Sequence, residues 1–270
     1  MAEPTPEDLQ RQLDSARELI GRGNEAMAEA HRILRGLLSS VRNARARGQI
    51  HQMIWDCERL SARRAKFFSQ SGQDAYLDER VFKGKRDGTF VEIGGYDGIT
   101  GSNCLFFELM RGWSGLLVEP APVFFEQAKA FRRATCLQLA LADQEGTAEF
   151  LEVAEGFSQM SGLTASYDAK LREAVEADPR HKGRLIEVKI TTLAALLDQH
   201  GLEEIDFISL DVEGGELAVL SSFPFERYNV HAWTIENNTG DTDVPALMHD
   251  RGYNRVEALG VDDIYVLGGG

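Results

Sequence analysis

Apolar and small side chains in the first 66 residues recur at spacings that alternate between four and three residues. The series spans five heptads and comprises Leu9, Leu13, Ala16, Ile20, Gly23, Met27, Ala30, Leu34, Leu37, Val41 and Ala44. A period of 3.5 residues is typical of a left-handed coiled coil. We therefore expect helix over residues 7–66, broken at Gly48. This stripe of apolar and small residues, called the seam below, predicts either oligomerisation through these helices or an intramolecular helical hairpin.

From residue 69 onward, short apolar runs alternate with helix-type patterns. We expect strands near 89–94, 114–119, 135–140, 147–153, 185–190, 205–211, 230–236, 253–257 and 263–268. Helices are expected at 73–82, 102–111, 122–132, 192–200, 214–222 and 243–251. This alternation predicts an α/β fold, with a doubly wound, mostly parallel sheet covered on both faces.

Two parts are thus expected, a helical region over 1–68 and an α/β domain over 69–270. The segment 154–184 is richer in Gly, Ser and charge, and it interrupts the alternation. We interpret it either as a mobile lid or substrate loop, or as a plain surface excursion.

The net charge of −14 is unevenly distributed. Residues 1–68 hold 12 Lys and Arg against 9 Asp and Glu, whereas the remainder holds 17 against 34. A body this acidic repels a phosphate backbone, which argues against nucleic-acid binding. No apolar run reaches about 18 residues, so no membrane span is expected. The polar N-terminus and three cysteines without CxxC spacing indicate a reduced, cytoplasmic protein.

A glycine-containing turn follows the strand expected at 89–94. Its spacing is Glu92-x-Gly94-x-x-x-Gly98, and Glu119 ends the next strand. Glycines let the backbone approach a ligand, and an acid at that place accepts hydrogen bonds from ribose hydroxyls. The pattern therefore indicates an adenosine-bearing cofactor. Asp97, in the same turn, either orients the cofactor or only stabilises the turn.

A third element of the expected cofactor site is the sequence Leu139–Asp143 after the third strand. Leu141 offers an apolar face to an adenine ring, Ala142 lies beside it, and Asp143 offers an acceptor for the exocyclic amine. The alternative is a strand end with a turn-capping aspartate.

Carboxylates also follow two later strands. Asp211 and Glu213 end the strand at 205–211, and Glu236, Asn237 and Asn238 end the next one. Adjacent parallel strands would bring Asp211 and Glu236 together, and such oxygen ligands suit Mg²⁺. Asp211 and Glu213 are also candidate catalytic residues, because carboxylates can act directly on a substrate without a metal. The alternative is a helix N-cap at Asp211 and a polar strand exit at Glu236.

Several segments in this order resemble the FkbM family of S-adenosylmethionine (SAM) methyltransferases. They are Phe68–Asp74, Gly88–Gly98 with Tyr96 inside it, Ser102-Asn103, Gly112–Pro120, Leu210–Glu216 and Ile235–Asn238. The resemblance covers 68–270 and implies a class I, Rossmann-like methyltransferase fold. It also implies O-methylation of a sugar hydroxyl in a glycoside, polysaccharide or natural product.

The resemblance further implies roles for single residues. Relatives that methylate sugars bind Mg²⁺ through residues matching Asp211, Glu236 and the asparagines after it, and the ion holds a sugar diol. Some carry a histidine base where this chain has Gly214, which makes Glu213 the nearest substitute. Gln73 and Asp74 are expected to close over the methionine end of SAM or to cap a helix, and Ser102 and Asn103 belong to the same cofactor motif.

Two other functions compete with this one. A nicotinamide-dependent oxidoreductase is disfavoured because G-x-G-x-x-G and Tyr-x-x-x-Lys are missing. A non-catalytic scaffold that works through its heptads is disfavoured by the polar residues at the strand ends. The expected partners are a sugar-containing acceptor and a second copy of the chain.

Overall fold

The computed structural model describes residues 6–60, 66–167, 169–238, 240 and 242–268. A seven-stranded sheet runs in the order β10-β11-β9-β8-β1-β2-β3. Its strands are β1 (Thr89–Ile93), β2 (Ser114–Val118), β3 (Thr135–Leu137), β8 (Glu204–Leu210), β9 (Asn229–Glu236), β10 (Tyr253–Leu259) and β11 (Asp262–Leu267). All neighbours pair in parallel except β10 with β11 and β11 with β9. The predicted α/β fold with a mostly parallel sheet is thus confirmed.

Both faces of this sheet are covered by apolar side chains, because successive residues of a strand point to opposite faces. Phe90, Phe207 and Ala232 pack with the aromatic residues before β2. Their neighbours Val91, Ile208 and Trp233 pack on the other face with helices α6 (Leu193–His200), α7 (Glu216–Ser222) and α8 (Asp243–Asp250). This double burial explains why the strands show as continuous apolar runs in the sequence.

A second sheet of four strands, in the order β4-β7-β5-β6, lies beside the first. Its strands are β4 (Ala140–Leu141), β5 (Gly146–Glu155), β6 (Gly162–Leu163) and β7 (Lys182–Thr191). The long antiparallel pair β5 and β7 dominates it. The segment 154–184 therefore contains β6 and helix α5 (Ala169–Glu176), neither of which the sequence pattern predicts.

Apart from α5, the α-helices of the body fall within the ranges expected from the sequence. They are α3 (Gln73–Tyr76), α4 (Pro122–Phe131), α6 (Leu193–His200), α7 (Glu216–Ser222) and α8 (Asp243–Asp250), with a short 3₁₀ turn η3 (Phe225–Arg227). Two of the ranges contain π-helical turns, η1 (Leu77–Val81) and η2 (Phe107–Arg111). Over the described residues, no helix has an apolar stretch of the length needed to cross a membrane.

The N-terminal region forms two helices, α1 (Pro6–Leu38) and α2 (Ala44–Leu60). The break thus falls at residues 39–43, and the expected break at Gly48 is wrong. Gly48 is buried inside α2, where a Cβ would lie 2.5 Å from the carbonyl oxygen of Gly260. The glycine lets the helix lie directly against the turn between β10 and β11.

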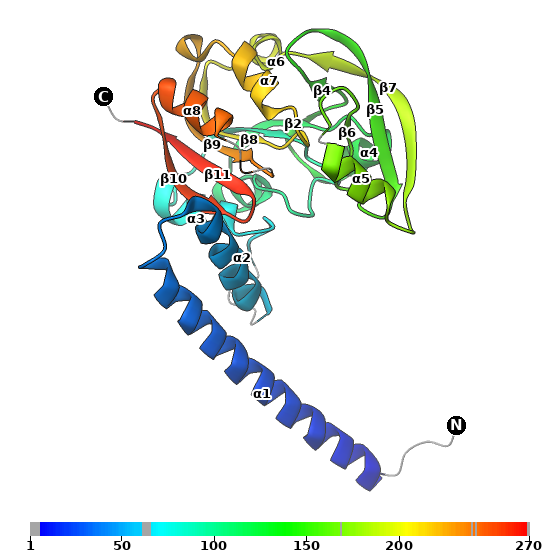
Figure 1. The fold of residues 1–270 in the computed structure, drawn as a ribbon, viewed down its shortest axis with the longest axis vertical. Coiled ribbons are helices and arrows are strands. Elements are labelled where there is room, and N and C mark those ends of the chain that lie inside the picture. Colours follow the sequence, from blue (N-terminus) through cyan, green and yellow to red (C-terminus); the bar gives the residue numbers. More distant parts are fainter. Residues whose placement is uncertain (1–5, 61–65, 168, 239, 241, 269–270) are drawn as a thin grey trace.

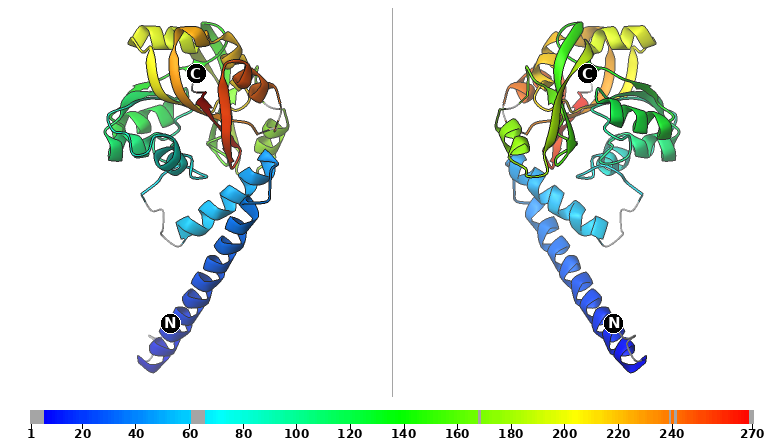
Figure 2. Two further views of the ribbon diagram at one scale, coloured as in Figure 1. Left: turned by 90° about the vertical axis from the view of Figure 1, so that its left-hand side faces the viewer. Right: turned by 90° about the vertical axis from the view of Figure 1, so that its right-hand side faces the viewer.

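The C-terminal half of α1 packs against α2 as a helical hairpin. Leu34 of α1 is buried with Ile50 and Ile54 of α2. The N-terminal half of α1 extends away from the body (Figures 1 and 2), and Leu19 and Ile20 are 57% and 64% exposed there. The side chains of seam positions 9 and 13 lie outside the described residues. The hairpin accounts for half of the seam, and oligomerisation through the other half stays a prediction.

Candidate active site

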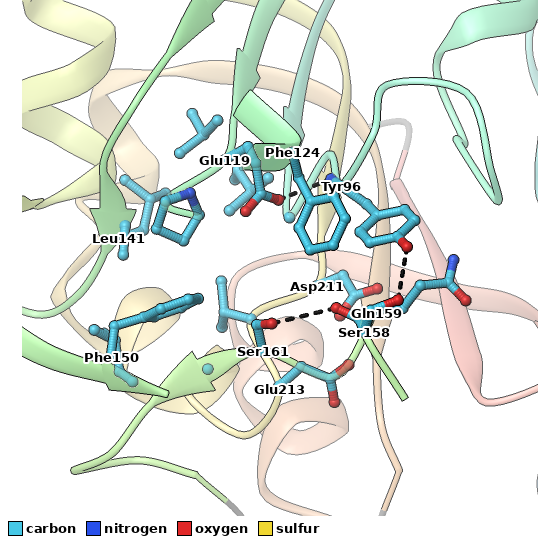
Figure 3. A pocket seen from close by; sticks show the side chains of 18 residues that line it. Tyr96, Glu119, Phe124, Leu141, Phe150, Ser158, Gln159, Ser161, Asp211 and Glu213 are labelled. Atoms are coloured by element: carbon cyan, nitrogen blue, oxygen red, sulfur yellow. Dashed lines mark hydrogen bonds between the residues drawn. The ribbon is translucent and has the colours of Figure 1, made fainter. Parts of the chain in front are cut away.

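A cavity that opens to solvent lies at the carboxyl ends of β1, β2 and β8 (Figure 3). Gly94 follows β1, Glu119 follows β2, and Asp211 follows β8. The rest of the wall comes from α4, the second sheet and the segment between β5 and β6, and includes Phe124, Leu141, Phe150, Ser158, Gln159, Ser161, Gly162 and Leu163. This is the edge at which open α/β sheets bind their ligands.

The two motif glycines serve different contacts. Gly94 has φ +79°, and a Cβ there would lie 2.1 Å from the carbonyl oxygen of Asp211. Gly98 has φ +82°, and a Cβ there would approach Arg132 to 2.9 Å and Ala128 to 3.0 Å. Gly94 thus brings the end of β1 against the end of β8, whereas Gly98 makes room for the C-terminal part of α4.

Glu119 is held in the wall of the cavity by two backbone donors. Tyr96 N–H donates to one of its carboxyl oxygens (Figure 3) and Ala121 N–H donates to the other, both with N···O distances of 2.8 Å. The residue is 5% exposed. Burial raises the pKa of this carboxyl to about 8, although both backbone hydrogen bonds lower it. The carboxyl therefore has a fixed orientation before any ligand binds.

Tyr96 connects the glycine turn to the segment that covers the cavity. Its backbone has φ +46°, its ring lies 4.2 Å from that of Phe124, and its hydroxyl is 2.7 Å from Ser158 Oγ. Asp97, in contrast, accepts hydrogen bonds from Ile99 N–H and from Thr100. These bonds are those of a turn-stabilising aspartate, the alternative raised from the sequence.

Glu92 and Ser102 lie behind the glycine turn and do not line the cavity. The Glu92 carboxylate accepts hydrogen bonds from Ser102 Oγ and from Arg132, both at 2.7 Å. Arg132 also pairs with Glu108 at 2.9 Å and donates to the Gly98 carbonyl at 3.1 Å. This buried ion network fixes the shape of the turn from the inside.

Asp74 is fully buried in the first turn of α3, whose N-cap residue, Gly72, has no side-chain cap hydrogen bond. Asp74 accepts hydrogen bonds from the N–H groups of residues 68, 69 and 75 and from Ser69 Oγ. Burial raises its pKa to about 6 against these bonds. Gln73 donates to Asp262 at 2.8 Å, and Asn103 donates to Ser209 at 3.0 Å. Gln73 thus points toward the acidic side of the site.

The apolar end of the cavity includes Leu141, as the sequence predicts for an adenine contact. Phe150 of β5 joins it and is 2% exposed. Ala142 pairs through its backbone with Thr191, and neither it nor Asp143 lines the cavity. Phe150 was not predicted from the sequence, because nothing there shows which apolar residue of β5 faces the cavity.

Three carboxylates converge at the other end. Asp211, Glu216 and Glu236 each offer an oxygen within 4.8 Å of the others. The parallel pairing of Leu210 with Ile235 brings the ends of β8 and β9 together. Burial and the neighbouring carboxylates raise the pKa of Asp211 and of Glu236 well above the ordinary values. The predicted proximity of Asp211 and Glu236 is thus present in the structure.

Glu213 adjoins this cluster and is strained. Its φ is +58°, a left-handed value that non-glycine residues seldom adopt. The side chain is 8% exposed, and its Oε2 has no hydrogen-bond partner among the described residues. Burial, followed by the charges of Glu216 and Asp262, raises the pKa of Glu213 to about 8. Such strain and unpaired burial are typical of functional sites.

The asparagines after β9 have other contacts. The Asn237 carboxamide donates to Asp263 at 3.3 Å. The backbone carbonyls of Asn237 and Asn238 accept hydrogen bonds from Arg45 of α2. The Asn237 side chain thus contacts Asp263 of β11.

Two acids at this end of the cavity, Glu216 of the cluster and the nearby Asp262, had no role in the sequence prediction. Glu216 accepts hydrogen bonds from Val212 N–H and Gly214 N–H, at 2.9 Å and 3.1 Å. Asp262 lies opposite Glu236 in the antiparallel pair of β11 and β9. The motif Gly214-Gly215-Glu216 could have indicated Glu216. The position of Asp262, in contrast, depends on the register between β9 and β11.

Comparison with known proteins identifies the family of this chain. Residues 92–255 match the model of the methyltransferase FkbM domain. A methyltransferase FkbM from Methylobacillus flagellatus KT is 11% identical, with 88% of this chain and 58% of that chain covered and a TM-score of 0.44. A TehB-like SAM-dependent methyltransferase from Corynebacterium glutamicum ATCC 13032 Kitasato is 12% identical, with 78% and 92% covered and a TM-score of 0.37.

This chain thus spans less than two thirds of the length of the Methylobacillus protein. No curated protein matches it. The family model, in contrast, matches more than half of the residues and includes the glycine turn, Glu119 and the cluster around Asp211. The chain therefore belongs to the FkbM family of SAM-dependent methyltransferases.

Proposed function

We propose that the protein transfers a methyl group from SAM to a hydroxyl of a sugar-containing acceptor. The proposal rests on one observation. Glu119 lines one end of the cavity, and Asp211 and Glu213 line the other end of the same cavity. Glu119 would accept hydrogen bonds from the ribose hydroxyls, and Leu141 would contact the adenine. The acceptor hydroxyl would then lie on the acidic side.

We also propose that Asp211, Glu216 and Glu236 hold a divalent cation. The fit is supported by their convergence within 4.8 Å, by the raised pKa values of Asp211 and Glu236, and by the unpaired Glu213 Oε2 beside them. Such an all-oxygen set suits Mg²⁺. A bound cation would supply Lewis acidity and a template for a sugar diol. A part for Asn237 and Asn238 in this set stays a prediction.

The protein's own residues would do three things. Glu119 and the Gly94 backbone would align the cofactor, and alignment of two reactants contributes up to roughly 7–11 kcal/mol in favourable cases. Glu213 would accept the hydroxyl proton as the acceptor oxygen bonds to the methyl carbon and the carbon–sulfur bond breaks. A base with a pKa of about 8 suits this task near neutral pH. Ser158, hydrogen-bonded to Tyr96, would help to exclude water.

Radiolabelled methyl transfer tests this function. The protein is incubated with methyl-labelled SAM and a panel of neutral glycosides, with Mg²⁺ or with EDTA. We expect cation-dependent transfer that falls by at least about 100-fold in Glu213→Gln and is unchanged in Glu155→Gln, which alters an exposed glutamate of β5. Full transfer in EDTA would exclude the cation, and full transfer by Glu213→Gln would exclude that base.

We further propose that a second copy of the chain covers the N-terminal half of α1. The seam that α2 covers near Leu34 continues along the same helix to Ile20, where it is exposed. Light scattering of the full chain should show a dimer. Ile20→Ser should shift it toward monomer, whereas Val123→Ser, at an exposed apolar site on α4, should not. An unchanged mass for Ile20→Ser would refute this interface.

A further inference from the structure

Helix α2 is attached to the sheet at the edge that carries the acidic cluster. Arg47 pairs with Glu257 of β10 through two hydrogen bonds, of 2.8 Å and 2.6 Å. Gly260 N–H, in the turn between β10 and β11, donates to the Gly48 carbonyl at 3.1 Å. These contacts bring the first turn of α2 beside the residues that follow β9, although almost 200 residues separate them in the chain.

Arg45, in that first turn, holds the loop after β9. Its Nη1 donates to the Asn237 carbonyl at 3.0 Å, and its Nη2 donates to the Asn238 carbonyl at 2.6 Å. The Asn237 carbonyl also accepts a hydrogen bond from Gly240 N–H at 3.1 Å. A guanidinium binds two adjacent acceptors as a planar fork, and a lysine cannot reproduce that geometry.

The loop that Arg45 holds begins directly after Glu236, the last residue of β9. Glu236 contributes an oxygen to the carboxylate cluster. Both hydrogen bonds that Arg45 donates to this loop go to backbone carbonyls, so Arg45 contacts the residues next to Glu236 through their backbone.

We propose that Arg45 is a positioning residue for the acceptor side of the active site. By fixing the carbonyls of Asn237 and Asn238, it sets the backbone from which Glu236 projects toward the cation. The N-terminal region would then be part of the methyltransferase unit and not an appendage. This inference depends on the proposed cation site, and the experiment below separates the two.

The test compares Arg45→Ala and Arg45→Lys with Arg42→Ala, a matched change at an exposed arginine between α1 and α2. The rate of hydrogen exchange at the Gly240 amide measures how firmly the loop after β9 is held. The rate at the Gly260 amide measures how firmly α2 is docked on the sheet. Titration with Mn²⁺ reports the cation site, and titration with S-adenosylhomocysteine reports the cofactor site.

We expect both Arg45 variants to exchange at Gly240 about tenfold faster, since two hydrogen bonds to a charged donor are lost or weakened. Mn²⁺ affinity should fall by about tenfold, as for other changes around metal ligands. Exchange at Gly260 and S-adenosylhomocysteine affinity should not change, and Arg42→Ala should match the wild type throughout.

Unchanged exchange at Gly240 in Arg45→Ala would overturn the proposal. Faster exchange at Gly260 would also overturn it, because Arg45 would then only dock the helix. Unchanged Mn²⁺ affinity beside faster Gly240 exchange would refute the link to Glu236. If the wild type bound no Mn²⁺, the proposed cation site would fail, while the exchange data would still decide whether Arg45 holds the loop.

Discussion

A Cβ at Gly94 would lie 2.1 Å from the carbonyl oxygen of Asp211. The turn after β1, at the cofactor end of the cavity, and the loop after β8, which carries the acids, are therefore in direct backbone contact. Asp211 N–H also donates to the Ile93 carbonyl at 3.2 Å. The two ends of the candidate active site are thus joined by a direct backbone hydrogen bond, and we expect a change in one to affect the other.

Gly94→Ala should abolish S-adenosylhomocysteine binding, because the new methyl group would push the two segments apart. The matched control is Gly252→Ala. Gly252 has a similar φ of +85°, but a Cβ there would meet no atom within 4 Å. Both variants carry the backbone strain of about 1–2 kcal/mol, and only the first carries the clash. Calorimetric titration that showed equal affinity for both variants would contradict this account.

Gly48→Ala should destabilise the protein, because its Cβ would lie 2.5 Å from the backbone of Gly260. We expect a loss of about 1–3 kcal/mol in the free energy of unfolding. Gly36→Ala, in α1, meets nothing within 4 Å and should be neutral or stabilising by about 0.5–1 kcal/mol. Urea denaturation measures both. Equal stability of the two variants would mean that α2 does not dock as described.

The buried carboxyls predict how stability depends on pH. Burial raises the pKa of Glu119 and Glu213 to about 8, and Asp211 and Glu236 shift in the same direction. Between about pH 4.5 and about pH 8, the folded state therefore binds more protons than the unfolded state, so stability falls as pH rises through this window.

Melting temperatures at about pH 5.5 and about pH 8.5 check the sign. In EDTA we expect a lower value at the higher pH, and Mg²⁺ should recover part of the loss because it binds the ionised carboxylates. In Asp211→Asn/Glu236→Gln the dependence should be flatter. The contrary result would be a melting temperature in EDTA that rises with pH, by the same amount in the variant and in the wild type. It would show that these carboxyls are not buried together.

The sequence pattern was sufficient for the main sheet. Strands such as Thr89–Ile93 and Glu204–Leu210 are buried on both faces, which leaves a continuous apolar run that ends in polar residues. The same logic predicted that Asp211 and Glu236 lie close together, because neighbouring parallel strands end at one edge.

Other features depend on contacts that no local pattern encodes. Glu92 has the spacing of a cofactor motif, yet it pairs with Arg132 on the far side of the turn. Asp262 faces Glu236 because of an antiparallel register, and a single-residue slip would have turned it away. Gly48 has the appearance of a helix break, but it serves a close contact with a turn more than 200 residues later.

The central claim is that the cavity binds the adenosine part of SAM through Glu119. Titration calorimetry with S-adenosylhomocysteine, with and without Mg²⁺, tests it most directly in the wild type, Glu119→Ala and Glu126→Ala, an exposed glutamate of α4. We predict binding by the wild type and Glu126→Ala, and a loss of at least about tenfold in Glu119→Ala. No binding by the wild type, or equal binding by Glu119→Ala, would contradict the account.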